Sequence, residues 1–253
     1  MGGLAYCFEQ EYVPRTLKNM KSKGLAVIDS DGIAAGTVRA AVKRGVFVYD
    51  YLNAGALEKE RSYYASMKEL RLAAYDGWPG EYWIDPTAEK WKKHLIDEAK
   101  AKKAKGAIGL YFDNTDIYYK VRHLKKQYSR NVPSQDAVYR ALADVVLTIV
   151  DDVGLIVMPN GGDDFVRRFV RDYPGYIRTI NQEGCLYENF KAQPSSERKY
   201  RTEYMDWAKE NGLYVRGIEY VKTATGKAKC KVYYAAHGWQ GLYISKHTDL
   251  RGD

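Results

Sequence analysis

The chain has 253 residues, of which 45% are hydrophobic, and its formal net charge is +8. This length suits one large α/β barrel or two small domains, and the apolar content is sufficient for a sizeable core. The three cysteines are far apart and form no CxxC motif, which argues against a disulfide scaffold and a zinc knuckle.

The basic charge raises the question of an anionic partner. No helix-turn-helix, zinc-finger or aromatic-basic RNA motif accompanies it, so we expect no nucleic-acid partner. Part of the charge lies in the run 100–105, which we interpret as the solvated face of a helix. The N-terminus lacks a charged segment followed by an apolar one, and no apolar stretch has the length of a membrane helix. We therefore expect no signal peptide in this chain and no membrane span.

Apolar segments alternate with amphipathic segments along the chain. The predicted strands are 4–8, 25–28, 46–52, 107–112, 155–158, 179–187, 213–218 and 241–245. The predicted helices are 14–24, 33–44, 58–74, 87–105, 135–153, 164–171, 198–210 and 227–236. Because apolar strands that alternate with helices form parallel sheets, this order predicts α/β architecture. Eight such units in this length favour one (β/α)8 TIM-like barrel over residues 1–253.

Two helices carry clear sequence signals. In 87–105 the apolar residues Trp91, Leu95 and Ala99 recur every four positions, which predicts one buried face. Ser134 precedes the helix 135–153 and is a suitable N-cap.

Polar residues follow the ends of most predicted strands. In a barrel, all strand C-termini lie on the face where the catalytic loops are found, so these residues should converge in one cleft. They are Asp29, Asn53, Asp113, Asn114, Asp116, Asn160, Glu188, Glu219 and Tyr220. The alternative for Asn114 and Asp116 is that they cap the next element.

A cleft of carboxylates and amides suits two chemistries. One is glycoside hydrolysis by two carboxyl groups, and the other is hydrolysis assisted by a hard metal ion. The histidines form no HxH or HExxH motif, so we expect no zinc, whereas Mg²⁺ or Ca²⁺ stays open. The glycine-rich motifs GxGxxG and GxxxxGK[ST] and the serine motif GxSxG are absent.

Three motifs together resemble glycoside hydrolase family 114, the endo-α-1,4-polygalactosaminidase family. They are Tyr-Leu-Asn-Ala-Gly at 51–55 with Glu58 and Arg61, Trp-Pro-Gly-Glu-Tyr-Trp-Ile-Asp at 78–85, and Gly-Leu-Tyr-Phe-Asp-Asn-Thr-Asp at 109–116. Further strand-end acids in matching places extend the resemblance from the first predicted strand to the seventh.

The resemblance implies a TIM-like barrel glycosidase that cleaves α-1,4-linked galactosamine polymers without a cofactor. It implies that Asp113 is the nucleophile or stabilising carboxylate and that Glu188 is the acid/base. A retaining mechanism would place these carboxyl groups about 5–5.5 Å apart. The implied substrate-binding residues are Asp29, Tyr51, Asn53, Trp78, Asn114, Asp116, Tyr118, Asn160, Glu219 and Tyr220.

Among these residues, Tyr51, Trp78 and Tyr118 are the aromatic side chains expected to stack on sugar rings, with ordinary packing as the alternative. The expected partner is a polysaccharide, and we expect a monomer. The resemblance also suggests a secreted or cell-surface protein from which a leader was removed, whereas the sequence alone leaves an intracellular protein as the alternative.

Two positions differ from the family pattern. Ala56 stands where the family usually has Glu, and Glu219 stands where it often has Asp. Both differences leave the identity of the cleaved polymer open. A net charge of +8 also matches a polycationic substrate poorly. Two alternatives therefore remain at this point. One is a barrel that binds a polysaccharide or an anionic wall polymer without cleaving it, and the other is a hydrolase with a metal between Asp113 and Asp116.

Overall fold

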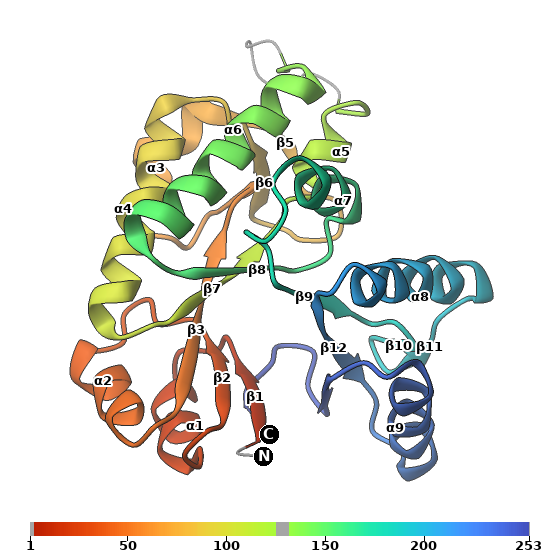
Figure 1. Ribbon diagram of the computed structural model, residues 1–253. Coiled ribbons are helices and arrows are strands. Elements are labelled where there is room, and N and C mark those ends of the chain that lie inside the picture. Colours follow the sequence, from red (N-terminus) through yellow and green to blue (C-terminus); the bar gives the residue numbers. More distant parts are fainter. Residues whose placement is uncertain (1–2, 125–131, 253) are drawn as a thin grey trace.

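The computed structural model describes residues 3–124 and 132–252, and these form a barrel of parallel strands (Figure 1). Its wall strands are β1 (Leu4–Cys7), β2 (Leu25–Ile28), β3 (Phe47–Asn53), β7 (Gly109–Asp113), β8 (Ile156–Pro159), β9 (Thr179–Glu183), β12 (Tyr214–Tyr220) and β13 (Gly241–Ser245). One sheet has the order β1-β2-β3-β7-β8 and another has the order β13-β12-β9.

A parallel bridge between Asn160 and Asn181 joins the two sheets. On the other side β13 lies against β1, where Tyr243 Oη donates to the Tyr6 carbonyl at 3.5 Å. The strands therefore follow one another around the barrel in chain order, as predicted.

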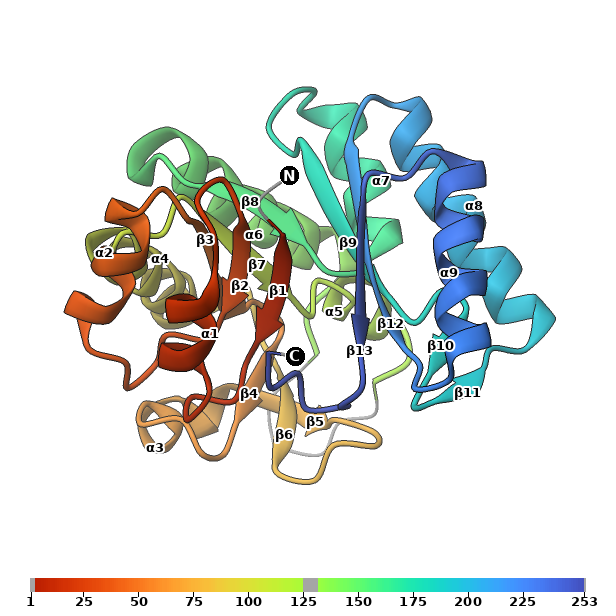
Figure 2. The same ribbon diagram turned by 90° about the horizontal axis from the view of Figure 1, so that it is seen from below.

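Helices cover the outside of this wall (Figure 2). They are α1 (Val13–Asn19), α2 (Ala35–Lys43), α4 (Glu89–Lys105), α5 (Ile117–Lys120), α6 (Gln135–Thr148), α7 (Asp163–Asp172), α8 (Ser195–Glu210) and α9 (Ala224–His237). The buried residues Trp91, Leu95 and Ala99 confirm the predicted inner face of α4. Ser134 caps α6 as expected, since its hydroxyl accepts from the Ala137 amide at 3.2 Å. Within the described ranges no helix has the length and apolar content that a bilayer crossing requires.

Tyrosine rings fill much of the barrel interior. One buried cluster consists of Tyr6, Val27, Tyr49, Tyr111, Met158, Ile218, Tyr220, Tyr243 and Leu250. Tyrosine supplies a large apolar ring together with a hydroxyl that needs a hydrogen-bond partner when it is buried. The Tyr6 hydroxyl finds one in Asn181 Oδ1, at 2.7 Å. The interior therefore accepts polar side chains from the strands that surround it.

The segment 58–74 is not a helix, and that prediction is wrong. Residues 56–84 instead form an antiparallel sheet of β4 (Ala56–Glu58), β5 (Arg71–Ala74) and β6 (Glu81–Ile84), with a short helix α3 (Tyr64–Met67) and a 3₁₀ turn (Lys68–Leu70). The helix-forming residues of 71–74 pair with β6, where the buried Trp83 joins Leu72 in the core. Packing thus overrides local helix propensity.

The sixth barrel strand ends at Glu183, several residues before the predicted end. Gly184, with φ +59°, turns the chain out of the sheet. Beyond the turn, β10 (Tyr187–Glu188) and β11 (Lys191–Ala192) form a separate two-stranded hairpin. The residue at the C-terminal end of the wall strand is therefore Glu183, and Glu188 lies on the hairpin.

The predicted solvated face at 100–105 is wrong for one residue, Lys102. Its side chain is buried on α4, and Nζ lies 3.5 Å from Oδ1 of Asp50, which is fully buried on β3. Asp50 also accepts from the Ser30 amide at 3.0 Å. A buried carboxylate needs such partners, because it has lost its hydration.

We predict that Lys102→Ala lowers the free energy of unfolding by about 3 kcal/mol, because Asp50 would remain buried without its cation. Lys100 is an exposed lysine on the same helix, and Lys100→Ala should change that energy by less than about 0.5 kcal/mol. Urea unfolding followed by circular dichroism measures both. Equal effects of the two substitutions would show that Lys102 is solvated.

Candidate active site

Asp113 and Glu183 lie together at the carboxyl ends of β7 and β9. The amide Nδ2 of Asn160 donates to Asp113 Oδ1 at 3.0 Å and to Glu183 Oε1 at 2.9 Å. These two hydrogen bonds limit the separation of the two carboxyl oxygens to about 6 Å. Asn160 is oriented in turn by Asn181, whose Nδ2 donates to Asn160 Oδ1 at 2.8 Å.

Two tyrosines from the barrel wall also hold Glu183. Tyr111 Oη donates to Glu183 Oε1 at 2.7 Å, and Tyr220 Oη donates to Oε2. Burial raises the pKa of Glu183, while the hydrogen bonds from Tyr220 and Tyr111 oppose that rise. The predicted site residue Tyr220 thus contacts the carboxyl group of Glu183.

Asp113 has an unusual protonation equilibrium. Burial, followed by the charge of Glu183, raises the pKa of Asp113 to about 8. Two close carboxyl groups in a poorly solvated site cannot both ionise readily, so the pair titrates as a unit. At neutral pH the pair therefore retains a proton, and one acid and one carboxylate stand side by side. General acid catalysis combined with a carboxylate nucleophile or base also requires one proton for two acids, and for Asp113 to act as the carboxylate that proton must lie on Glu183.

The antiparallel sheet brings a second pair of acids to the same face. Asn53 Nδ2 lies 3.0 Å from Glu58 Oε1 and 3.1 Å from Glu81 Oε1. Asn114 Nδ2 also donates to Glu81, at 3.2 Å. Burial and then the charge of Glu58 raise the pKa of Glu81 to about 7. The predicted residues Asn53 and Asn114 therefore orient carboxyl groups from a different sheet.

The glycine of the motif at 51–55 permits this arrangement. A Cβ atom at Gly55 would lie 1.9 Å from the Asn114 carbonyl oxygen, so only glycine allows the two loops to approach. Asn114 itself has a left-handed backbone, with φ 61°. Its side chain donates to Asn53 Oδ1 at 3.0 Å and accepts from Tyr75 Oη at 3.1 Å.

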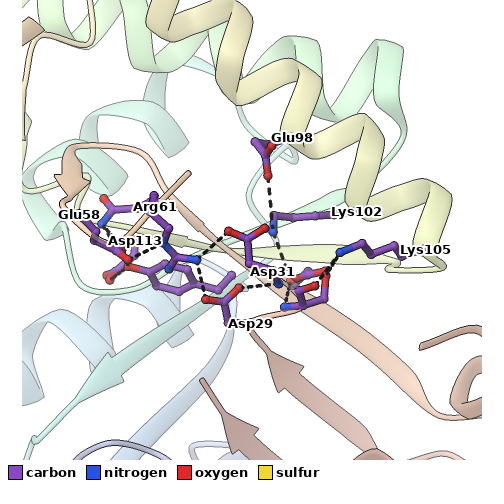
Figure 3. A network of polar contacts seen from close by, with 12 residues as sticks. Asp29, Asp31, Glu58, Arg61, Glu98, Lys102, Lys105 and Asp113 are labelled. Carbon is purple, nitrogen blue, oxygen red and sulfur yellow. Dashed lines mark hydrogen bonds and ion pairs between the residues drawn. The ribbon is translucent and has the colours of Figure 1, made fainter. Parts of the chain in front are cut away.

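Arg61 forms ion pairs with three acids on one side of the carboxylate cluster. Figure 3 shows its guanidinium between Glu58 on one side and Asp29 and Asp31 on the other. The ion pairs measure 2.6 Å to Glu58, 2.8 Å to Asp29 and 3.1 Å to Asp31. Burial raises the pKa of Asp29, and Arg61 counteracts that rise. The predicted ligand Asp29 is therefore already engaged by a cation.

Glu188 has different partners from those of Asp113. Its Oε2 lies 2.7 Å from Arg201 Nη1 and 3.3 Å from Gln193 Nε2. The charge of Glu188 still raises the pKa of Glu183, so the hairpin is near the site. Glu183, however, is the acid that shares a hydrogen-bond donor with Asp113.

Two predicted ligands, Glu219 and Tyr118, are buried and have partners within the protein. Glu219 is fully buried, and its carboxylate accepts from the Leu186 and Tyr187 amides, at 2.8–3.1 Å, and from Tyr234 Oη, at 3.0 Å. Tyr118 is 8% exposed, and its ring packs against Tyr139 with the centroids 5.9 Å apart. Sugar binding by Glu219 and Tyr118 stays a prediction that this burial does not favour.

Asp116 and Trp78 lie on the loops around the site. Asp116 precedes α5, and burial together with the charge of Asp163 raises the pKa of Asp116 to about 6. Trp78 lies between β5 and β6 and is 63% exposed, so its ring is accessible to a ligand. Sugar binding by these two residues stays a prediction. In the described part of the chain, no group of three or more His, Cys, Asp or Glu side chains is arranged to hold a metal ion.

Sequence reasoning missed Glu183, Glu81 and Tyr111. Because β9 contains the polar residues Asn181 and Gln182, the pattern of apolar residues does not show where this strand ends. Gly184, directly after Glu183, was the available signal, because the other predicted strands also end shortly before a glycine or a polar turn. For Glu81 the available signal was its place inside the motif 78–85.

The family model for glycoside hydrolase family GH114 matches residues 6–252 of this chain. The structure is similar to the glycoside hydrolase domain of PelA from Pseudomonas aeruginosa, with a TM-score of 0.78 and 16% identity over 99% of this chain and 97% of that one. It is also similar to Ega3 from Aspergillus fumigatus, solved with galactosamine, with a TM-score of 0.69 and 16% identity over 98% and 90% of the two chains. An α-galactosidase from Thermus thermophilus has a TM-score of 0.59 and 10% identity over 95% and 57%.

A protein of Thermotoga maritima described as uncharacterized is 22% identical over 214 residues, which cover 78% of this chain. The match spans 64% of that protein, so this chain corresponds to less than two thirds of its length. The solved glycoside hydrolases confirm the predicted TIM-barrel fold. Since the family model covers nearly the whole chain, the protein is a member of glycoside hydrolase family GH114.

Proposed function

We propose that this protein is a glycosidase that cleaves galactosamine-type amino-sugar polymers, with Asp113 and Glu183 as its catalytic pair. The observation that carries the proposal is the Asn160 amide, which holds both carboxyl groups at 2.9–3.0 Å. Family membership and the likeness to Ega3, solved with galactosamine, support the substrate class. A barrel that only binds polymer has no need for two buried acids held by one amide group.

The spacing of the pair fits a retaining mechanism. Retaining glycosidases hold their two carboxyl groups about 5–5.5 Å apart, whereas inverting ones leave about 6.5–9.5 Å for a water molecule. Asp113 would attack the anomeric carbon, which is the role that the family resemblance implies for it. Glu183 takes the acid/base role that sequence reasoning had given to Glu188. It would protonate the leaving oxygen and then activate the water that releases the product.

Substitution of the pair tests the catalytic residues. Asp113→Asn and Glu183→Gln should each lower kcat by about 10³-fold or more, because each removes a group that reacts with the bond. Glu188→Gln is the matched control and should lower kcat by less than about 10-fold, since it removes an ion pair between the hairpin and α8 and a minor charge effect on Glu183 but no group of the proposed pair. Reducing-end release from a partially deacetylated α-1,4-galactosamine polymer measures all three.

If Glu188→Gln abolished release while Glu183→Gln did not, Glu188 would be the acid/base. Activity that survives both Asp113→Asn and Glu183→Gln would exclude the pair altogether. Azide rescue of small Ala or Gly variants separates the roles. A nucleophile variant should give the glycosyl azide of inverted configuration, and an acid/base variant should give the retained one.

The charge of the cleft predicts a preference among polymers. Glu58, Glu81 and Asp113 lie close together, and at least part of their charge would face a bound sugar. We expect kcat/KM to fall about tenfold or more when the amino groups are fully acetylated, because the ammonium charge is lost. A glucosamine polymer of equal deacetylation is the control for sugar type. No release from any galactosamine polymer by the unmodified protein would contradict the proposed function.

A further inference from the structure

The Tyr51 hydroxyl lies between two carboxyl groups that do not contact each other. Its oxygen is 3.2 Å from Asp113 Oδ2 and 3.1 Å from Glu58 Oε1. Asn53 Nδ2 donates to the same oxygen at 3.1 Å. A tyrosine hydroxyl has one proton, so it can donate to only one of the two carboxylates at a time.

The two acids do not compete equally for that proton. Glu58 forms an ion pair with Arg61, whose Nε lies 2.6 Å from Glu58 Oε2 (Figure 3). Among the residues that the structure describes, no cation pairs with Asp113 in this way, and burial raises the pKa of Asp113 to about 8. Charge-assisted hydrogen bonds to a carboxylate are the stronger ones, so the Tyr51 proton is directed to Glu58.

We propose that Glu58 is a positioning residue which, through the Tyr51 hydroxyl, keeps Asp113 protonated in the free enzyme and so sets the lower pH limit of activity. In this arrangement the protonated Asp113 carboxyl group donates a hydrogen bond to Tyr51 Oη, and the Tyr51 hydroxyl donates one to Glu58. No bond other than a hydrogen bond changes. The inference rests on the proposed function, in which Asp113 must lose this proton before it can attack.

Other groups also face Asp113 and enter its protonation equilibrium. The charged and titratable side chains around it come from β3, β4, β6, β7, β9 and β12 and from the loops that follow β4 and β5. They are Tyr51, Glu58, Tyr75, Glu81, Tyr111, Glu183, Tyr220 and Arg61. Among them, the Tyr51 hydroxyl is the group placed between Asp113 and a carboxylate with its own cation. Replacing Glu58 therefore acts on Asp113 through one identifiable hydrogen bond.

Glu58→Gln removes the charge that attracts the Tyr51 proton. The hydroxyl can then donate to Asp113, which stabilises the Asp113 carboxylate and lowers its pKa. A group whose pKa falls ionises at lower pH, so the acidic limb of the kcat/KM profile should move down by about one pH unit. The variant should thus gain activity at acid pH relative to its own maximum, which a purely structural lesion would not produce.

The same shift should be visible without turnover. In protein labelled with ¹³C at the aspartate carboxyl carbon, the Asp113 resonance is assigned by its loss in Asp113→Asn and is titrated by NMR. Asp31→Asn is the matched control, because Asp31 pairs with the same Arg61 but has no contact with Tyr51. It should move the Asp113 pKa by less than about 0.3 units, since charge felt only across solvent is weak.

Tyr51→Phe separates the hydrogen bond from charge acting through space. In that background Glu58→Gln should no longer shift the Asp113 titration. If the shift persists undiminished, or if Glu58→Gln leaves the titration and the acidic limb unchanged, the inference is wrong. Should Glu58→Gln fail to fold, Glu58→Asp keeps the charge near Arg61 but withdraws it from Tyr51, and a shift of the same sign is expected.

Failure of this inference is distinguishable from failure of the proposed function. Full activity of Asp113→Asn would overturn the proposed function. Loss of activity in Asp113→Asn together with an unshifted titration in Glu58→Gln would overturn only the part assigned to Glu58.

Discussion

One asparagine connects the closure of the barrel to the spacing of its acids. The backbone of Asn160 forms the bridge to Asn181 that joins the two sheets, and its side-chain amide holds Asp113 and Glu183. The planar amide has two hydrogens on Nδ2, one for each carboxyl group, and its oxygen accepts from Asn181. A shift between β8 and β9 would therefore change the distance between the two acids. The fold and the chemistry depend on the same few atoms.

The sequence predicted the elements whose pattern is set by burial and failed where polar residues point inward. The apolar run before Asp113 and the segment 241–245 correspond closely to β7 and β13. In β9, by contrast, Asn181 and Glu183 face the barrel interior, where Tyr6, Tyr111 and Tyr220 bind them. The strand itself was predicted from residue 179, but its pattern does not show that Asn181 and Glu183 point inward, because the hydroxyl groups that bind them come from distant parts of the chain. The prediction of one domain over 1–253 stays a prediction.

The abundance of tyrosine has a structural explanation. The chain has 23 tyrosines, and in the barrel cluster the rings provide apolar packing while several hydroxyls reach the acids at the rim. Tyr111 and Tyr220 bind Glu183 from inside the wall, and Tyr51 stacks near Tyr111, with the ring centroids 6.3 Å apart. Tyr111 and Tyr220 are buried, whereas Tyr51 is partly exposed, and sugar stacking by Tyr51 stays a prediction. Of the three aromatic residues expected to stack on sugars, Trp78 is the one with an exposed ring.

The small sheet of β4, β5 and β6 lies outside the barrel wall, yet it supplies Glu58 and Glu81 to the carboxylate face. Its strands pair only with one another in the described structure, so its residues can change without disturbing the register of the wall. Part of the charge that acts on Asp113 thus comes from a sheet that does not align Asp113 with Glu183. Substitutions in this sheet would change the acidity of the site while the barrel keeps the proposed catalytic pair in place.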